Sequence, residues 1–119
     1  MTGHDIMASW DEKLLTAARE GNIKEVELCI KNRANLECRG DYFGMTPLML
    51  AAERGHLEVV TYLVTHGSRL EATSTRSGRT ALHYAAENGQ IDTTKWLLDQ
   101  GCSHWVKTNE VTFSFILIR

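Results

Sequence analysis

The sequence contains one proline and three cysteines among its 119 residues, and it has no long apolar run. A single proline excludes collagen-like and proline-rich chains. No stretch approaches the roughly 18 consecutive apolar residues that a membrane span needs. Charge is nearly balanced, since 13 Lys and Arg residues face 15 Asp and Glu residues and the net charge is −2. This balance argues against a stand-alone nucleic-acid-binding domain, because such domains are usually strongly basic.

The three cysteines, Cys29, Cys38 and Cys102, are far apart in the sequence. They form no C-x-x-C pair, so the sequence indicates neither a zinc ribbon nor a dithiol redox site. An odd number is also unusual for a secreted protein with a disulfide framework. Residues 1–9 contain neither the basic segment nor the apolar segment of a secretory signal. We therefore expect reduced thiols in a cytoplasmic or nuclear protein.

The sequence does contain an internal repeat with a period of 34 residues. When the chain is shifted by this length, residues 46–55 (TPLMLAAERG) fall on residues 80–89 (TALHYAAENG). A further shift brings residues 16–21 (TAAREG) into the same columns. The second halves of the units align as well, at residues 21–26, 55–60 and 89–94. Three units in one frame predict a repeat architecture, in which each unit is stabilised by stacking on its neighbours.

The repeated residues resemble the ankyrin repeat family, whose motif reads T-P-L-H-x-A, a second Ala and a Gly, then G-H-L-E-V-V and L-L-x-x-G-A. In this chain the second unit reads TPLMLAA from Thr46, GHLEVV from Gly55 and LVTHGS from Leu63. The third unit reads TALHYAA from Thr80 and LLDQGC from Leu97. The resemblance covers residues 10–109. The usual period of the family is 33, so the loops 37–45 and 71–79 each carry one extra residue.

The resemblance implies an all-α solenoid of about three helix pairs with short β-hairpin fingers between the pairs. We expect a single ankyrin repeat domain over residues 10–109, preceded by an N-terminal tail at residues 1–9. The expected units and the segment that follows them are 10–40, 41–74, 75–109 and 110–119. Residues 110–119 would then be an incomplete fourth unit or an apolar tail.

Local signals agree with helix pairs. Thr46 and Thr80 suit the N-cap position, because a hydroxyl can accept a hydrogen bond from an amide of the first turn. Pro47 suits the first helical position, where its missing N–H costs nothing. Gly55 ends a helix cheaply, whereas Arg33 stands where the repeat predicts a glycine. The expected helices of the first unit and the expected second helices of the other units are 12–20, 24–32, 58–66 and 92–100.

The residues with reactive side chains favour a structural interpretation. His56 and His83 occupy motif columns in which the resemblance implies hydrogen bonds that hold a turn. His66 and His104 have no second ligand at metal spacing, Cys29 and Trp96 fall in apolar columns, and Trp105 can be core or exposed. The sequence has no phosphate-binding loop, nucleophile elbow or H-E-x-x-H motif. We therefore expect a protein that is not an enzyme and that needs no cofactor or metal.

In the ankyrin family, partners usually bind the hairpin fingers and the exposed ends of the first helices. The resemblance therefore implies a scaffold or adaptor that binds a protein through this concave face. The matching positions are Arg39, Asp41, Tyr42, Phe43, Met45, Glu53, Arg54, Arg76, Arg79, Glu87 and Asn88. Tyr42 and Phe43 support the interpretation, since aromatic residues and arginine are enriched at interfaces.

Three alternatives remain open at the level of sequence. The two aromatics can pack on the neighbouring finger, with the arginines merely solvated. Arg69, Arg76 and Arg79 lie close together in the sequence with only Glu71 opposing them, so the second finger could bind a nucleotide or nucleic acid. The chain could also be an architectural segment of a longer repeat protein, with no partner of its own.

The final residues are unusually apolar for the end of a solenoid, which normally presents a polar outer face. The apolar positions are Val111, Phe113, Phe115, Ile116, Leu117 and Ile118. A half helix of this length is not stable alone in water. The segment therefore either covers the third helix pair or is loose and promotes self-association, as in a truncated or alternative form of a longer protein.

Deletion of residues 110–119 separates these two cases. If the segment covers the third unit, deletion lowers the free energy of unfolding, because apolar surface is exposed. If the segment is loose, deletion leaves stability unchanged and reduces self-association. Chemical denaturation and analytical ultracentrifugation measure the two effects. A monomeric protein in which deletion changes neither quantity would contradict both interpretations.

Overall fold

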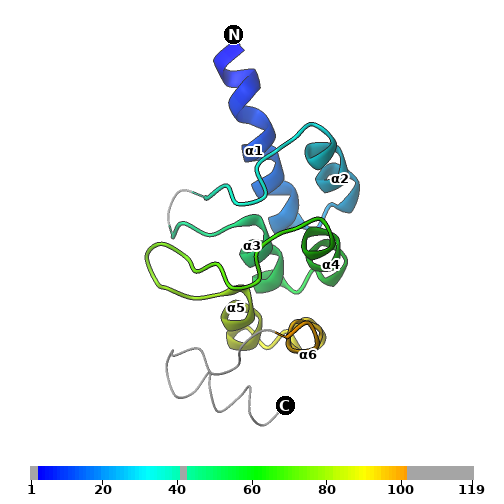
Figure 1. Cartoon of the computed structure of the whole chain (residues 1–119), viewed down its shortest axis with the longest axis vertical. Coiled ribbons are helices and arrows are strands. Elements are labelled where there is room, and N and C mark those ends of the chain that lie inside the picture. Colours follow the sequence, from blue (N-terminus) through cyan, green and yellow to red (C-terminus); the bar gives the residue numbers. More distant parts are fainter. Residues whose placement is uncertain (1–2, 41–42, 102–119) are drawn as a thin grey trace.

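A computed structural model describes residues 3–40 and 43–101 of the chain, with side chains placed from Trp10 onward. Its helices are α1 (Gly3–Glu20), α2 (Ile23–Lys31), α3 (Pro47–Arg54), α4 (Leu57–Thr65), α5 (Ala81–Glu87) and α6 (Ile91–Asp99). Helices α1, α3 and α5 pack in series, and α2, α4 and α6 form a second layer beside them (Figure 1). The expected all-α solenoid of helix pairs is confirmed. Over the described residues, no helix is long and apolar enough to cross a membrane.

The helices begin and end at the residues that the sequence singles out. The hydroxyl of Thr46 accepts a hydrogen bond from the Met49 amide, and Pro47 occupies the first turn of α3. Thr80 caps α5 in the same way and forms a capping box with His83, whose Nδ1 accepts from the Thr80 amide at 2.9 Å. These contacts satisfy amides that have no partner within a helix.

One helix end lacks its expected glycine. After α2, Arg33 adopts a left-handed conformation with φ of 66°. The equivalent residues one and two units later are Gly67 and Gly101, which also have positive φ. A side chain is disfavoured in this region because its Cβ crowds the backbone. The first unit thus keeps the turn of the repeat despite an unfavourable residue.

Helix α1 begins at Gly3, well before the residue 12 expected from the repeat. It therefore covers most of residues 1–9, which the sequence analysis treats as a tail, while the limits of the repeat domain remain a prediction. Residues 4–11 contain neither proline nor glycine, so nothing interrupts the helix. At its centre, the Lys13 ammonium lies 4.8 Å from the centroid of the Trp10 ring, one turn earlier.

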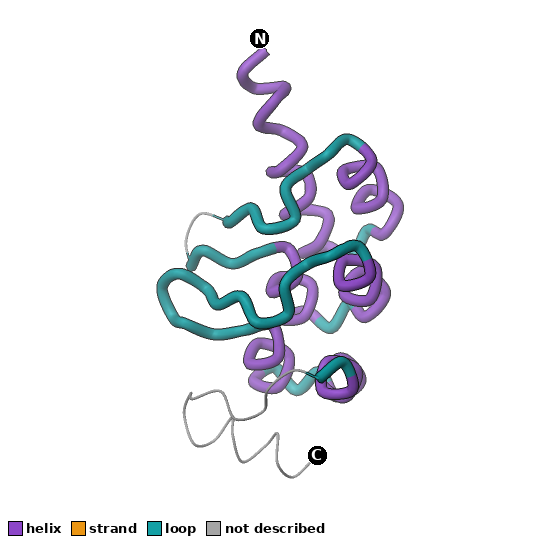
Figure 2. The backbone as a smooth tube through the Cα atoms, viewed as in Figure 1, coloured by secondary structure: helices purple, strands orange, loops and turns teal. Residues whose placement is uncertain are grey.

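The fingers differ from the expected β-hairpins, since the described residues contain no strand (Figure 2). In the described part of the first finger (residues 37–40 and 43–45), the Gly40 amide donates to the Met45 carbonyl at 2.9 Å. The second finger, residues 71–79, is closed by the Ser74 amide and the Arg79 carbonyl at 2.8 Å. In this finger the hydroxyls of Ser74 and Ser77 bond to each other and to Tyr84, and such local side-chain bonds compete with a regular ladder. The described parts of the fingers are therefore hydrogen-bonded turns rather than strand pairs.

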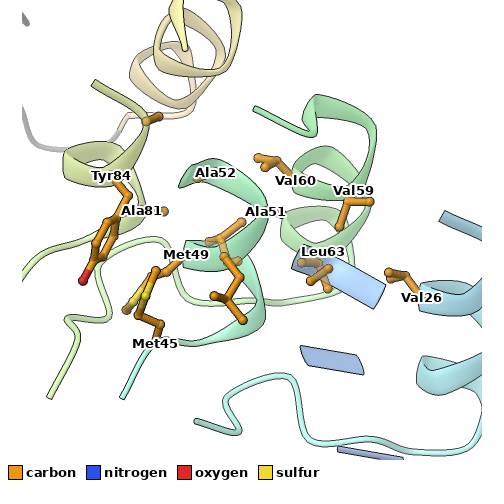
Figure 3. Close-up of a cluster of buried hydrophobic side chains, with 14 of the residues drawn as sticks. Val26, Met45, Met49, Ala51, Ala52, Val59, Val60, Leu63, Ala81 and Tyr84 are labelled. Carbon is orange, nitrogen blue, oxygen red and sulfur yellow. The ribbon is translucent and has the colours of Figure 1, made fainter. Parts of the chain in front are cut away.

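The core lies between the two helix layers and extends through all three units (Figure 3). Paired alanines of the first helices are buried at each interface, at Ala17, Ala18, Ala51, Ala52, Ala85 and Ala86. Val26, Cys29, Val59, Val60, Leu63 and Leu97 fill the space towards the second helices. Cys29 is thus a core residue, as expected. Trp96 is half-buried and packs against the edge of the core.

The predictions for Cys102, His104, Trp105 and residues 110–119 fall outside the described residues, so they stay predictions.

Substitution of Ala85 by leucine tests the close packing of the first helices. Ala85 is fully buried in α5, which packs against α3. Three further heavy atoms should overpack this interface and lower the free energy of unfolding by about 1–3 kcal/mol. Lys95→Leu, at an exposed position of α6, is the matched control and should change stability little. Equal denaturation midpoints for Ala85→Leu and the unmodified protein would contradict this packing.

Candidate partner-binding surface

The two fingers lie next to each other and are joined by one arginine. The Nη1 atom of Arg39 donates to the carbonyl oxygens of Gly44 and Thr73, at 2.7 Å each. Two backbone bonds run between the fingers in addition, from Thr75 to Gly44 at 3.4 Å and from Arg76 to Phe43 at 3.2 Å. Hydrogen bonds from a charged donor are stronger than neutral ones. Arg39 therefore fixes the spacing of the fingers.

The second finger is also anchored to the helix that follows it. The hydroxyls of Ser74, Ser77 and Tyr84 form a closed set, with oxygen–oxygen distances of 2.7, 3.0 and 3.0 Å. Ser74 and Tyr84 are buried, whereas Ser77 is exposed. The Ser74 hydroxyl also accepts from the Arg79 amide at 3.2 Å. The base of the finger is thus held to α5 by side chains rather than by a strand ladder.

Arg79, which lies just before α5, forms an ion pair with Glu87, the last residue of α5. The Arg79 Nε atom lies 3.1 and 2.9 Å from the two carboxylate oxygens, and Nη2 lies 2.7 Å from Oε2. This bidentate arrangement restricts both side chains. The structure thereby brings these two predicted site residues into contact with each other.

Other predicted positions are exposed on this side of the molecule. Phe43 is 47% exposed and is the largest apolar side chain presented by the described part of the fingers. Arg54, Arg76 and Asn88 are exposed, and Glu53 is half-buried. Asn88 also uses its side-chain amide to donate to the Tyr84 carbonyl at 2.8 Å. Asp41 and Tyr42 lie outside the described residues.

Met45 differs from the other predicted site positions, because its side chain is buried rather than exposed. Its side chain is only 6% exposed and belongs to the core, together with Met49 and Tyr84 (Figure 3). Arg79 occupies the same column one unit later and reaches the Glu87 carboxylate instead. A flexible apolar side chain gains free energy by filling the space beneath the finger, whereas a guanidinium does not. The column thus has different roles in the two units.

The structure adds a groove that the sequence analysis does not name. Glu12, Leu15, Thr16, Arg19 and Gly40 line a space of about 290 Å³ between α1 and the first finger. Arg19 stands in the column of Glu53 and Glu87, which the sequence analysis does select. Extending the same frame by one unit would have found it. The first helix pair is polar, as is typical of a terminal unit, so this column does not stand out in the sequence as part of a binding surface.

A family model for ankyrin repeats in three copies matches residues 14–108 of the chain. The chain belongs to the ankyrin repeat family. Ankyrin repeats are generally protein–protein interaction modules and are typically not enzymes. A search of curated proteins finds no match to this chain.

The histidines of the ankyrin motif have the structural roles expected of them. His56 Nε2 donates to the Arg19 carbonyl at 2.9 Å and links the second unit to the first. His83 closes the capping box of α5. His66 Nδ1 donates to the Tyr62 carbonyl at 2.8 Å. Within residues 3–40 and 43–101, no three His, Cys, Asp or Glu side chains are grouped so that they could hold a metal ion.

The cysteines of the first unit have thiols that resist ionisation. Burial, and then the nearby Asp11 carboxylate, raises the pKa of Cys38 to about 12. Burial, with a smaller effect of Glu25, also raises the pKa of Cys29. Nucleophilic cysteines need a lowered pKa, because the thiolate is the reactive form. Both thiols thus have the opposite electrostatic environment from a catalytic cysteine.

Replacement of Arg39 by methionine tests how the ankyrin fingers are joined. Methionine keeps much of the side-chain volume but cannot donate to Gly44 or Thr73. We expect the free energy of unfolding to fall by about 1 kcal/mol and the amides of Thr75 and Arg76 to exchange with solvent faster. Native-state hydrogen exchange measures this effect. Arg54→Met, at an exposed position, is the control, and equal exchange rates in both variants would show that Arg39 does not join the fingers.

Proposed function

We propose that this ankyrin domain is a non-enzymatic scaffold or adaptor that binds a protein partner through its finger surface. This surface comprises the first finger, the second finger and the groove beside α1. The observation that carries the proposal is Phe43, a large apolar side chain that is 47% exposed on a finger fixed by Arg39. Exposed aromatic residues in a rigid setting are typical of interface hot spots.

The rigidity of the fingers supports binding on energetic grounds. Ordering a loop on association costs free energy that must be recovered from contacts. Here the described parts of the fingers are already held by the Arg39 bonds and by the hydroxyl set around Tyr84. A partner would therefore lose little affinity to loop ordering. Phe43 and Arg76 together offer an apolar contact beside an exposed cation.

The nucleic-acid alternative has weaker support. Of the three arginines near the second finger, Arg79 is paired with Glu87 in a bidentate ion pair. Glu71 is exposed beside Arg69, and the whole chain has a net charge of −2. Phosphate recognition needs several cations that are free to replace counterions. We therefore propose a protein partner. We also propose that the protein acts in the cytoplasm or the nucleus.

Two alanine substitutions test the finger surface. The unmodified domain is used to capture a partner from cell extract, and the affinity for the purified partner is then measured by calorimetry. Phe43→Ala and Arg76→Ala should each weaken binding by about 1 kcal/mol or more, about fivefold or more in Kd. Circular dichroism should show unchanged helix content in both variants.

Lys95→Ala is the control, since Lys95 is exposed on the second helix layer. It should leave Kd unchanged. A captured partner that is indifferent to Phe43→Ala and Arg76→Ala would place the site elsewhere. Capture that disappears on nuclease treatment, with retention that falls steeply with salt, would favour the nucleic-acid alternative.

A further inference from the structure

Helices α2 and α4 lie next to each other in the layer of second helices, away from the fingers (Figure 1). A second groove lies between these two helices. It has a volume of about 280 Å³. Its walls are formed by Ile23, Glu27, Glu58, Thr61, Tyr62 and Thr65. Ile23 and the Tyr62 ring provide apolar surface, and the carboxylates come from one helix each. The volume is large enough for one long side chain of a partner but not for a folded element.

Apart from the Tyr62 hydroxyl, the side-chain polar atoms that line this groove act as hydrogen-bond acceptors. Glu27 and Glu58 form no ion pair with any described residue. The hydroxyl protons of Thr61 and Thr65 are already donated to the carbonyls of Glu58 and Thr61, at 2.9 and 2.7 Å. The two hydroxyl oxygens therefore retain lone pairs but no free proton. The lysines of α2, Lys24 and Lys31, do not line the groove.

The aromatic wall of the groove is fixed in place. The rings of Tyr62 and His66 are 4.0 Å apart between centroids and tilted by 30°. His66 is held in turn by its bond to the Tyr62 carbonyl. An aromatic face attracts a cation, and a planar guanidinium can stack on it. Two carboxylates beside such a face favour arginine as the guest.

The residues of this groove differ in charge from those at the same positions one unit later. One period later, Thr61 is replaced by Lys95, while Glu58 is matched by Asp92 and Tyr62 by Trp96. The third unit thus has a lysine in the column where the second unit has a neutral threonine. Glu27 and Glu58 form no ion pair with a described residue. The groove between α2 and α4 therefore carries two carboxylates, with a neutral threonine where the next unit has a lysine.

We propose that the groove between α2 and α4 binds an arginine side chain from a basic segment of a protein partner. The guanidinium lies between the carboxylates of Glu27 and Glu58, and its aliphatic stem packs on Ile23 and the Tyr62 ring. The domain then has two interaction surfaces, the fingers and this groove, on different helix layers. This inference does not depend on what binds the fingers.

Titration of the ¹⁵N-labelled full chain with the capped peptide acetyl-Gly-Arg-Gly-amide tests the proposal by NMR. We expect saturable shifts of the amides in residues 23–28 and 58–66, weaker at high salt. The same peptide with citrulline, which has the shape of arginine without its charge, should produce no saturable shift. Glu27→Gln and Glu58→Gln should each weaken binding about two- to fivefold, as expected for exposed ion pairs.

A second set of variants uses the difference between the units. Thr61→Lys places a cation in the groove, using the residue that occupies the same column one unit later, and should abolish binding of the arginine peptide. Thr61→Gln, of similar length but neutral, should retain it. Glu12→Gln removes a charge from the finger surface and should have no effect, which controls for net charge.

Several results would overturn the proposal. They are equal shifts with the citrulline peptide, shifts centred on the fingers, unchanged binding in Thr61→Lys, and the absence of any saturable shift. Amide spectra of each variant without peptide show whether it is folded, so a misfolded variant cannot be mistaken for a loss of binding. None of these results concerns Phe43 and Arg76. If the arginine peptide does not bind the groove, the proposed finger surface is still tested separately by Phe43→Ala and Arg76→Ala.

Discussion

Close contact between α1, α3 and α5 is the constraint on which the rest of the structure depends. It is possible because each helix presents two alanines to its neighbour, and all six are nearly or fully buried. Larger residues would push the helix axes apart, and the side-chain bonds between units would then no longer reach. Each pair of short helices buries little apolar surface alone, so stacking supplies the stability that a unit lacks.

The edges of the stack are joined by side chains that reach back to the preceding unit. His56 donates to the Arg19 carbonyl, and Gln90 donates to the Glu53 carbonyl at 3.0 Å. Both bonds span 37 residues and satisfy a carbonyl near the end of a first helix. Histidine and glutamine are thus interchangeable here, since each can place one N–H at the same distance from the backbone. This position of the repeat therefore requires a side chain that donates a hydrogen bond, and not one particular residue.

The repeat frame predicted the helix pairs, the caps at Thr46 and Thr80 and the alanine interfaces, because these depend on local chemistry that recurs in every unit. It did not predict the finger geometry, the burial of Met45 or the role of Arg39. Those features depend on contacts between units, and the sequence of one unit does not show what its neighbour offers. The early start of α1 was missed for a related reason, since no repeat column exists before residue 10.

Function in such an array must come from the columns in which the units differ. Positions that are the same in every unit hold core residues, helix caps and bonds between neighbouring units. Such positions cannot distinguish one partner from another. Met45 and Arg79 share one column yet are buried in one unit and ion-paired in the next. Thr73 occupies the column of Arg39 one unit later, and the Arg39 guanidinium donates to the Thr73 carbonyl. An arginine present in one unit only thus bonds its finger to the finger of the next unit. Thr61 and Lys95 differ in the same way on the second helix layer. A solenoid with a uniform backbone can therefore present chemically distinct surfaces on its two layers without any change of fold.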